Sequence, residues 1–138
     1  MSDDEIRTFL VTGTRTGKLA TVRPDGRPHV APIWFVLDGD EVVFTTWHES
    51  VKGRNLDRTG RAALAVDLEE PPYAFVTIEG PIAISEDPAE RLHFATRIGA
   101  RYMGEERAEE FGRRNGVEGE WVVKLQMEKV VAKDEMSA

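Results

Sequence analysis

Short runs of strand-forming residues, separated by turn signals, constrain the fold of this chain more than any other feature. The cluster Pro24-Asp25-Gly26-Arg27 separates a run over residues 18–22 from a longer run over 28–37. Asp38-Gly39-Asp40 then leads into a run over 41–47 that is rich in Val, Phe, Thr and Trp. Pro, Asp and Gly supply turn geometry, and β-branched and aromatic residues favour strands. We expect these three strands to form a meander.

Helix signals interrupt the strand runs in four places. The first helix follows a capping-box pattern of Ser2 and Glu5. The other three are expected over 51–58, after a Ser50 cap and before Gly60; from Pro88, after an Asp87 cap and before Gly104; and over 105–114.

Strand signals resume over 61–68 and 73–84, on either side of a break at 69–72. Apolar and polar residues alternate from Trp121 to Glu128, which predicts a last, half-buried strand. About six strands in mostly sequential order, with helices as inserts and covers, favour a small antiparallel barrel over a doubly wound sheet. We expect the 138 residues to form one domain, 1–138.

Composition narrows the compartment and the partners. The chain has no cysteine, which excludes disulfides, thiolate metal sites and a cysteine nucleophile. A formal net charge of -7 argues against nucleic-acid binding. The first five residues are acidic rather than basic, and no apolar run approaches the roughly 20 residues that span a bilayer. We expect a cytoplasmic protein with no nucleic-acid or membrane partner.

Metal and hydrolytic chemistry find little support. His29, His48 and His93 are scattered without ligand spacing, so no protein-bound metal is expected. The serines lack a nucleophile elbow. The segment 13–18 resembles a phosphate-binding P-loop, but three residues rather than four separate its glycines, and we interpret it as a turn.

The segment 44–56 has the features of a phosphate site. A strand carries Thr45 and Thr46, a short loop follows, and a helix then begins with Ser50 as its cap and with Lys52 and Arg54 in its first turns. Free N–H groups and the helix dipole at such a start attract anions, and cations strengthen the attraction. The alternative is an ordinary serine cap with Lys52 and Arg54 in solvent.

Two prolines in the run 28–37 point to a covered strand edge. Proline removes a ladder donor and sits at an edge, at a bulge or where something other than a strand covers the backbone. Pro28 and Pro32 flank or adjoin Val30, Ala31, Ile33 and Trp34, which together offer a flat apolar surface suited to a tricyclic ring. The alternative is a bulged edge strand with core residues.

The runs 19–34, 43–46, 52–56, 61–64 and 75–80, in that order, resemble the pyridoxamine 5'-phosphate oxidase-like split-barrel superfamily. They are similar in particular to its small branch of flavin-dependent or coenzyme F420-dependent oxidoreductases. The resemblance implies a mainly β fold, a six-stranded antiparallel split barrel of the FMN-binding type. It also implies a homodimer with two cofactor sites shared across its interface, and a small-molecule substrate.

The resemblance also implies which residues bind the cofactor. Lys52 matches the phosphate-binding position, Ser50 the phosphate loop, and Val30 to Trp34 the strand edge along the ring. The full set is Val30, Ala31, Pro32, Ile33, Trp34, Thr45, Thr46, Ser50, Lys52, Arg54 and Asn55, with Tyr73, Thr77 and Trp121 from the partner chain. The catalytic residues are unknown. His29 and Tyr73 are the side chains to test as proton donors, with solvent favoured over both.

The chain departs from the true pyridoxamine phosphate oxidases. It lacks their arginine-rich C-terminal segment and a pyridoxal phosphate site, so a role in vitamin B6 synthesis is not expected. The run Lys-Gly-Arg-Asn-Leu over 52–56 favours coenzyme F420 over FMN. The expected function is hydride transfer from reduced coenzyme F420 to an electron-poor conjugated molecule. The alternatives are an FMN-dependent oxidoreductase of the same fold, a non-catalytic flavin-, haem- or tetrapyrrole-binding protein, and a dimeric scaffold.

Overall fold

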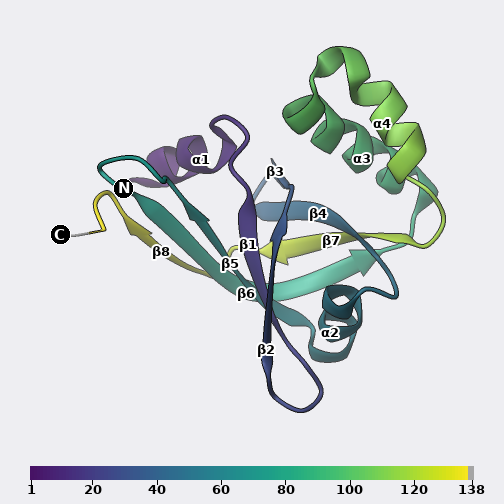
Figure 1. Cartoon of the computed structure of the whole chain (residues 1–138), viewed down its shortest axis with the longest axis horizontal. Helices are drawn as coiled ribbons and strands as arrows, with labels where there is room; N and C mark the ends of the chain where they lie inside the picture. Colours follow the sequence, from purple (N-terminus) through teal and green to yellow (C-terminus); the bar gives the residue numbers. More distant parts are fainter. Residues whose placement is uncertain (137–138) are drawn as a thin grey trace.

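A curled antiparallel sheet forms the body of the computed structural model, which describes residues 1–136 (Figure 1). Within that range the sheet has eight strands in the order β2-β1-β5-β6-β7-β4-β3, and β8 pairs with β6 beside this path. The strands are β1 (Gly17–Val22), β2 (Pro28–Ile33), β3 (Val36–Asp38), β4 (Glu41–Trp47), β5 (Arg61–Asp67), β6 (Phe75–Ser85), β7 (Glu120–Gln126) and β8 (Lys129–Lys133).

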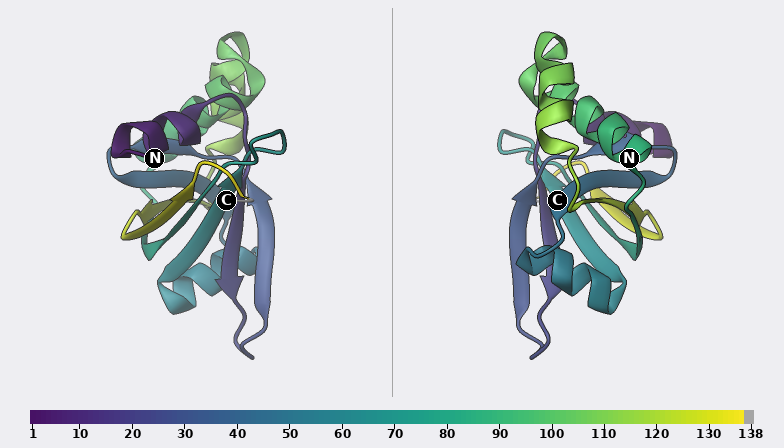
Figure 2. Two further views of the ribbon diagram at one scale, coloured as in Figure 1. Left: turned by 90° about the vertical axis from the view of Figure 1, so that its left-hand side faces the viewer. Right: turned by 90° about the vertical axis from the view of Figure 1, so that its right-hand side faces the viewer.

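The helices lie at the ends and on one side of this sheet (Figures 1 and 2). They are α1 (Asp3–Val11), α2 (Val51–Thr59), α3 (Pro88–Met103) and α4 (Ala108–Asn115), with a short 3-10 turn η1 (Glu105–Arg107) between the last two. The predicted caps are confirmed at Ser2, Ser50 and Asp87, and α2 and α3 end at Gly60 and Gly104. Across residues 1–136, no helix combines the length and the apolar character needed to cross a bilayer.

The bend of β6 turns the sheet into a barrel. Its first half pairs with β5 and β8, and its second half, from Ile82 to Ser85, pairs with β7. Gly80 lies between the two halves. A Cβ atom there would come within 2.0 Å of the backbone oxygen of Gln126, so only glycine lets the end of β7 pass this close. β6 therefore belongs to both halves of the sheet, and the barrel is split between these halves.

The main core fills the concave side of the sheet. It consists of Leu10, Leu19, Ile33, Phe35, Leu37, Val42, Phe44, Leu56, Leu64, Val66, Val76, Ile78, Val123 and Leu125. A smaller cluster of Val36, Val43, Phe94, Ile98 and Val122 joins α3 to the opposite face of β3, β4 and β7. Because successive side chains of a strand point to opposite faces, β4 and β7 are covered on both.

The predicted mainly β split barrel is confirmed, but the number and the order of the strands differ from the prediction. The run 28–37 divides at Trp34 and Phe35 into β2, which pairs with β1, and β3, which pairs with β4. The hydroxyl of Tyr102 accepts from the Phe35 N–H, and Arg101 donates to the Phe35 carbonyl. Side chains of α3 thus replace the sheet partner at this point. The three-stranded meander was wrong for that reason.

The last predicted strand, over 121–128, corresponds to β7, and a further strand that was not predicted follows it. β7 ends at Gln126, and β8 turns back to pair with the first half of β6. The expected half-buried alternation fails at Val122, which is fully buried beside Val123. Val122 packs under α3 while Val123 faces the main core, so burial on both faces removes the alternation.

Candidate functional site

The start of α2 is held by the serine cap that the sequence predicts. The Ser50 hydroxyl accepts from the Gly53 N–H at 3.0 Å and donates to the Trp47 carbonyl at 2.7 Å. It also lies 2.9 Å from the Thr46 hydroxyl. Because the hydroxyl hydrogen of Ser50 already points to the Trp47 carbonyl, Thr46 is the donor in this second hydrogen bond. Thr46 is almost fully buried. Both hydroxyls are therefore engaged within the loop that leads into the helix.

Gly53 makes this loop possible. A Cβ atom at position 53 would lie 2.7 Å from the Trp47 carbonyl oxygen and 3.0 Å from Ser50 Oγ. The close turn of the chain into α2 thus depends on the glycine of the Lys-Gly-Arg-Asn-Leu run. The N–H groups of Val51 and Lys52 precede the first intrahelical bonds and can donate to a bound anion.

The cations in the first turns of α2 both act on carboxylates of the protein. Arg54 is 68% exposed and lies 3.6 Å from Glu49. Lys52 is half-buried, and its charge acts on the carboxyl of Glu120, the first residue of β7. Burial raises the pKa of Glu120, while the charges of Lys52 and His48 pull it down. A ligand phosphate at this helix start must therefore compete with carboxylates for both cations.

Asn55 serves the fold. Its side chain is 2% exposed, donates to Thr21 Oγ1 at 3.1 Å and accepts from Arg58 at 3.2 Å. Arg58 also donates to the Val22 carbonyl. Asn55 and Arg58 thereby hold α2 on the end of β1, and neither the amide of Asn55 nor its surroundings offer a surface for a cofactor.

An aromatic corner lies next to the start of α2. Trp47 is paired with Glu120, and Thr46 with Trp121, in the register of β4 and β7. The backbone N–H of His48 donates to the Gly119 carbonyl at 2.9 Å, and its Nδ1 lies 2.9 Å from the same oxygen. The Trp47 ring covers Gly119, where a Cβ atom would come within 2.4 Å of it. The entry to β7 and the entry to α2 are thus joined in one place.

Residues 30–34 do not form one flat surface. Val30 is 67% exposed and Ile33 only 6%, because alternate side chains of β2 point to opposite faces of the sheet. Ala31 lies on the inner side with Ile33, and Pro32 on the outer side with Val30. What β2 does offer is its free edge, since β2 is the end strand of the sheet. Of the two readings of this run, the edge strand with core residues fits the side chains.

Trp34 belongs to an aromatic stack at the far end of β2. Its ring lies parallel to that of Tyr102, with centroids 4.8 Å apart, and 5.9 Å from the ring of Phe111. At the other end of the strand, the Nδ1 atom of His29 is buried and has no hydrogen-bond partner among residues 1–136. β2 therefore runs from the neighbourhood of α2 to that of α3 and α4, as Figure 1 shows.

Two of the three residues expected from a partner chain, Thr77 and Tyr73, lie away from the start of α2, whereas Trp121 lies opposite Thr46 at the aromatic corner. Thr77 points to the outer side of the sheet with Val30 and Pro32, as the strand register shows. Tyr73 lies in the turn between β5 and β6, in a left-handed conformation with φ of 62°. β5 follows α2 directly and ends before this turn, so its full length separates Tyr73 from α2. Within one chain, Tyr73 and Lys52 are not neighbours.

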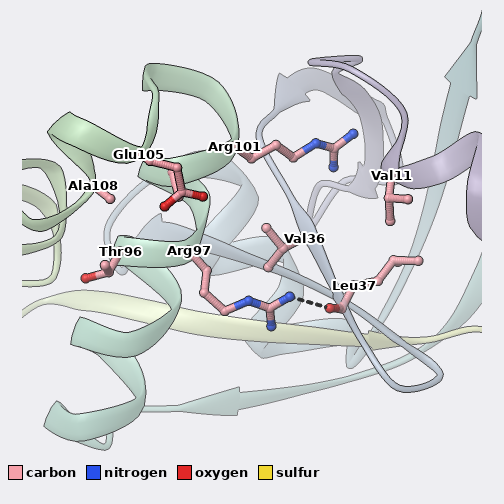
Figure 3. A pocket seen from close by; sticks show the side chains of 9 residues that line it. Val11, Val36, Leu37, Thr96, Arg97, Arg101, Glu105 and Ala108 are labelled. Atoms are coloured by element: carbon pink, nitrogen blue, oxygen red, sulfur yellow. Dashed lines mark hydrogen bonds between the residues drawn. The ribbon is translucent and has the colours of Figure 1, made fainter.

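The cavity drawn in Figure 3 lies elsewhere. It measures about 450 Å³ and is bounded by α3, β3, the end of α1 and η1. Arg97 donates to the Leu37 carbonyl at 2.8 Å on one side of it, and Glu105 lies on another side. None of the candidate cofactor residues lines this cavity. Most of the candidate residues instead lie on α2, β2, β4 and the start of β7, where Ile33, Thr46 and Asn55 are buried.

Sequence reasoning missed Glu120 and the role of His48. Neither has a spacing signal relative to Lys52, since 68 positions separate residues 52 and 120, and only the pairing of β4 with β7 brings them together. Within residues 1–136 no three of the His, Asp and Glu side chains gather in a way that could hold a metal ion.

Comparison with known proteins places this geometry in a family. The family model described as pyridoxamine 5'-phosphate oxidase matches residues 2–133. No relative was found among proteins of curated function.

Three solved structures illustrate the range of similar proteins. A conserved hypothetical protein from Mycobacterium tuberculosis is 28% identical with a TM-score of 0.84, over 97% of this chain and 85% of that one. An F420 reductase is 27% identical with a TM-score of 0.71, over 90% and 94%. The haem storage protein HutZ from Vibrio cholerae is 21% identical with a TM-score of 0.74, over 95% and 94%, a likeness that shows the fold alone.

Proposed function

The chain belongs to the pyridoxamine 5'-phosphate oxidase family, and on this premise we propose that it is an oxidoreductase that uses reduced coenzyme F420 to transfer hydride to an electron-poor conjugated small molecule. The observation that carries the proposal is the start of α2, where free N–H donors and Lys52 meet directly after a strand. The similarity to an F420 reductase supports this cofactor over others.

The residues present fit the phosphate end of such a cofactor. Val51 and Lys52 provide N–H donors, and the ammonium group of Lys52 provides a charge-assisted contact. The free edge of β2 has prolines at positions 28 and 32, which have no backbone N–H. An aromatic ring can therefore lie along this edge without leaving an N–H group at either position without a partner. When bound, the reduced deazaflavin supplies the hydride, and the protein supplies position and electrostatics.

The chain's own groups have defined tasks in this arrangement. Ser50 and Gly53 fix the direction of the α2 N–H groups, and Asn55 and Arg58 keep the helix against β1. Trp47 and Trp121 lie on β4 and β7 next to the start of α2, whereas Trp34 stacks on Tyr102 of α3. No described side chain stands out as a general acid, so protonation of the product falls to solvent.

We further propose that two copies of the chain complete the site. The outer face of β2, β1, β5, β6 and β8 carries small and apolar residues, namely Val30, Ala20, Ala63, Ala65, Thr77 and Val131. Val30 and Val131 are exposed. Two ion pairs lie within the same face: Lys18, opposite Ala65, pairs with Asp67 at 2.7 Å, and Glu79, opposite Ala63, pairs with Lys129 at 3.7 Å. A face of small and apolar residues whose charges are already paired is suited to contact with a second copy of the chain.

Cofactor titration tests the proposal. The purified protein is titrated separately with coenzyme F420 and with FMN, followed by fluorescence, at low and at high salt. We expect tighter binding of coenzyme F420, whose acidic tail extends beyond the phosphate, and a steeper loss of its affinity with salt. In Lys52→Ala we expect roughly 10- to 150-fold weaker binding, the value of one charge-assisted contact.

Arg113→Ala is the matched control, because it also removes one positive charge but lies on the exposed side of α4. Its affinity should equal that of the wild type. Tighter binding of FMN would favour an FMN-dependent oxidoreductase of the same fold. Equal binding by wild type and Lys52→Ala would remove Lys52 from the site.

A further inference from the structure

The carboxyl group of Glu120 lies beside the anion site without being part of it. Glu120 opens β7 opposite Trp47, the last residue of β4, and α2 begins a few residues after Trp47. His48 binds the Gly119 carbonyl with both its backbone N–H and its ring, and the Trp47 ring packs on Gly119. These contacts fix the start of β7 against the segment that leads into α2.

The carboxylate of Glu120 is a negative charge of the protein itself near the start of α2. It is half-buried, and the positive charges that act on it are those of Lys52 and His48. Negative charge near a helix start is favourable, because the helix dipole and the free N–H groups attract it. In the protein without ligand, Glu120 therefore fills part of the electrostatic role that a bound phosphate takes.

The other ionisable groups of this corner are three carboxylates and two basic side chains, and one carboxylate lies next to both basic groups. Glu49 lies 3.4 Å from His48 Nε2 and 3.6 Å from Arg54. Glu118 precedes Glu120 by two residues, and Glu86 accepts from the indole N–H of the neighbouring Trp121. Lys52 is thus the cation for which Glu120 and a ligand compete.

We propose that Glu120 couples anion binding at the start of α2 to proton uptake: its carboxylate competes with the ligand phosphate for Lys52, and the anion binds tightly when Glu120 is protonated. This inference rests on the proposed function, since it concerns the same phosphate site. By reciprocity, an anion bound at Lys52 raises the pKa of Glu120, and lowering the pH strengthens anion binding. Partial burial keeps the two negative charges from being screened by solvent.

Sulfate is the probe, because its charge does not change between about pH 5 and about pH 8. Exposed glutamates also stay ionised over this range. Binding is followed by NMR through the amide signals of Val51 and Lys52. Three proteins are compared: the wild type, Glu120→Gln and Glu49→Gln. Both variants remove one carboxylate within the same corner, but Glu49 is exposed and Glu120 is half-buried.

We expect Glu120→Gln to bind sulfate at least about threefold more tightly than the wild type near pH 8, and this ratio to fall towards one as Glu120 becomes protonated. The ratio for Glu49→Gln should stay constant over the same range. In the wild type, sulfate should also raise the pKa of the Glu120 carboxyl, measured by carbon NMR.

Equal affinities of wild type and Glu120→Gln, or a ratio that does not change with pH, would overturn the coupling while leaving the anion site in place. If sulfate shifts neither amide in any of the three proteins, the anion site itself is absent. That result would also remove the phosphate contact on which the proposed function rests.

Discussion

Polar side chains of α2 divide between those that hold the fold and those whose charge acts on a neighbouring group. Asn55 illustrates the first kind, since its amide joins the hydroxyl of Thr21 to Arg58 beneath α2. Lys52, three residues earlier, illustrates the second kind, because its positive charge acts through space on the carboxyl of Glu120. One helix turn thus carries both a structural and an electrostatic role.

Replacing Asn55 with Ala should destabilise the protein by about 1–3 kcal/mol, because the buried Thr21 hydroxyl then loses its partner. Urea unfolding measures the change. Asp57→Asn, on the exposed side of the same helix, should stay within about 0.5 kcal/mol of the wild type. If both variants lost the same stability, the Asn55 contacts would add nothing to the docking of α2.

At the scale of elements, α1 depends on arginines from elsewhere in the chain. α1 has no basic residue in its last turn. Arg101 of α3 donates to the carbonyls of Leu10, Gly13 and Phe35, and Arg15 donates to that of Phe9. The bonds to Phe9 and Leu10 satisfy carbonyls at the end of α1 that have no intrahelical partner, and those to Gly13 and Phe35 fix the segments beside it. Burial lowers the pKa of Arg101, yet its three carbonyl contacts require the charged fork.

Arg101→Lys should therefore cost about 2–4 kcal/mol of stability, since one ammonium group cannot reach three carbonyls in different elements. Amide hydrogen exchange should show faster opening of α1 than of the sheet. Arg113→Lys, at an exposed ion pair, should leave both readouts unchanged. Unaltered exchange in α1 of Arg101→Lys would contradict the role of Arg101 as its cap.

α3 is tied to the sheet through Glu90, and this tie predicts a dependence on pH. Hydrogen bonds from Lys124 and Ser85 lower the pKa of Glu90 below its ordinary value. A carboxyl whose pKa is lower in the folded state stabilises the protein above its unfolded pKa, and this stabilisation is lost as the pH falls through the folded value. Thermal melts from neutral pH to about pH 3 should show a smaller loss of stability in Glu90→Gln than in the wild type. Parallel curves would show that Glu90 contributes no such linkage.

At the scale of the whole molecule, the outer sheet face predicts a homodimer. We expect light scattering after size-exclusion chromatography to give about twice the 15.5 kDa mass of the chain. Ala63→Glu places a second carboxylate directly opposite Glu79 on this face and should give a monomer, because a stable interface excludes like charges buried side by side. Leu92→Glu, on the exposed side of α3, should remain dimeric. A monomeric wild type would count against a shared cofactor site.

Sequence alone determined the local elements of this protein. Turn and cap residues act within a few positions of the chain, so the caps at Ser2, Ser50 and Asp87 and the bounds of β4 follow from the residues themselves. The run at 52–56 marked the start of α2 for the same reason. These signals need no partner from a distant segment.

Tertiary structure decided what depends on distant partners. Tyr102 and Arg101 bind the backbone groups of Phe35 and so divide the run 28–37. They lie 67 and 66 positions from Phe35 in the sequence. α3 buries Val122 and removes the alternation in β7. The register of β4 and β7 sets Glu120 opposite Trp47, where the charge of Lys52 acts on its carboxyl. Such contacts leave no periodic trace in the sequence, because each depends on the packing of two elements that only folding brings together.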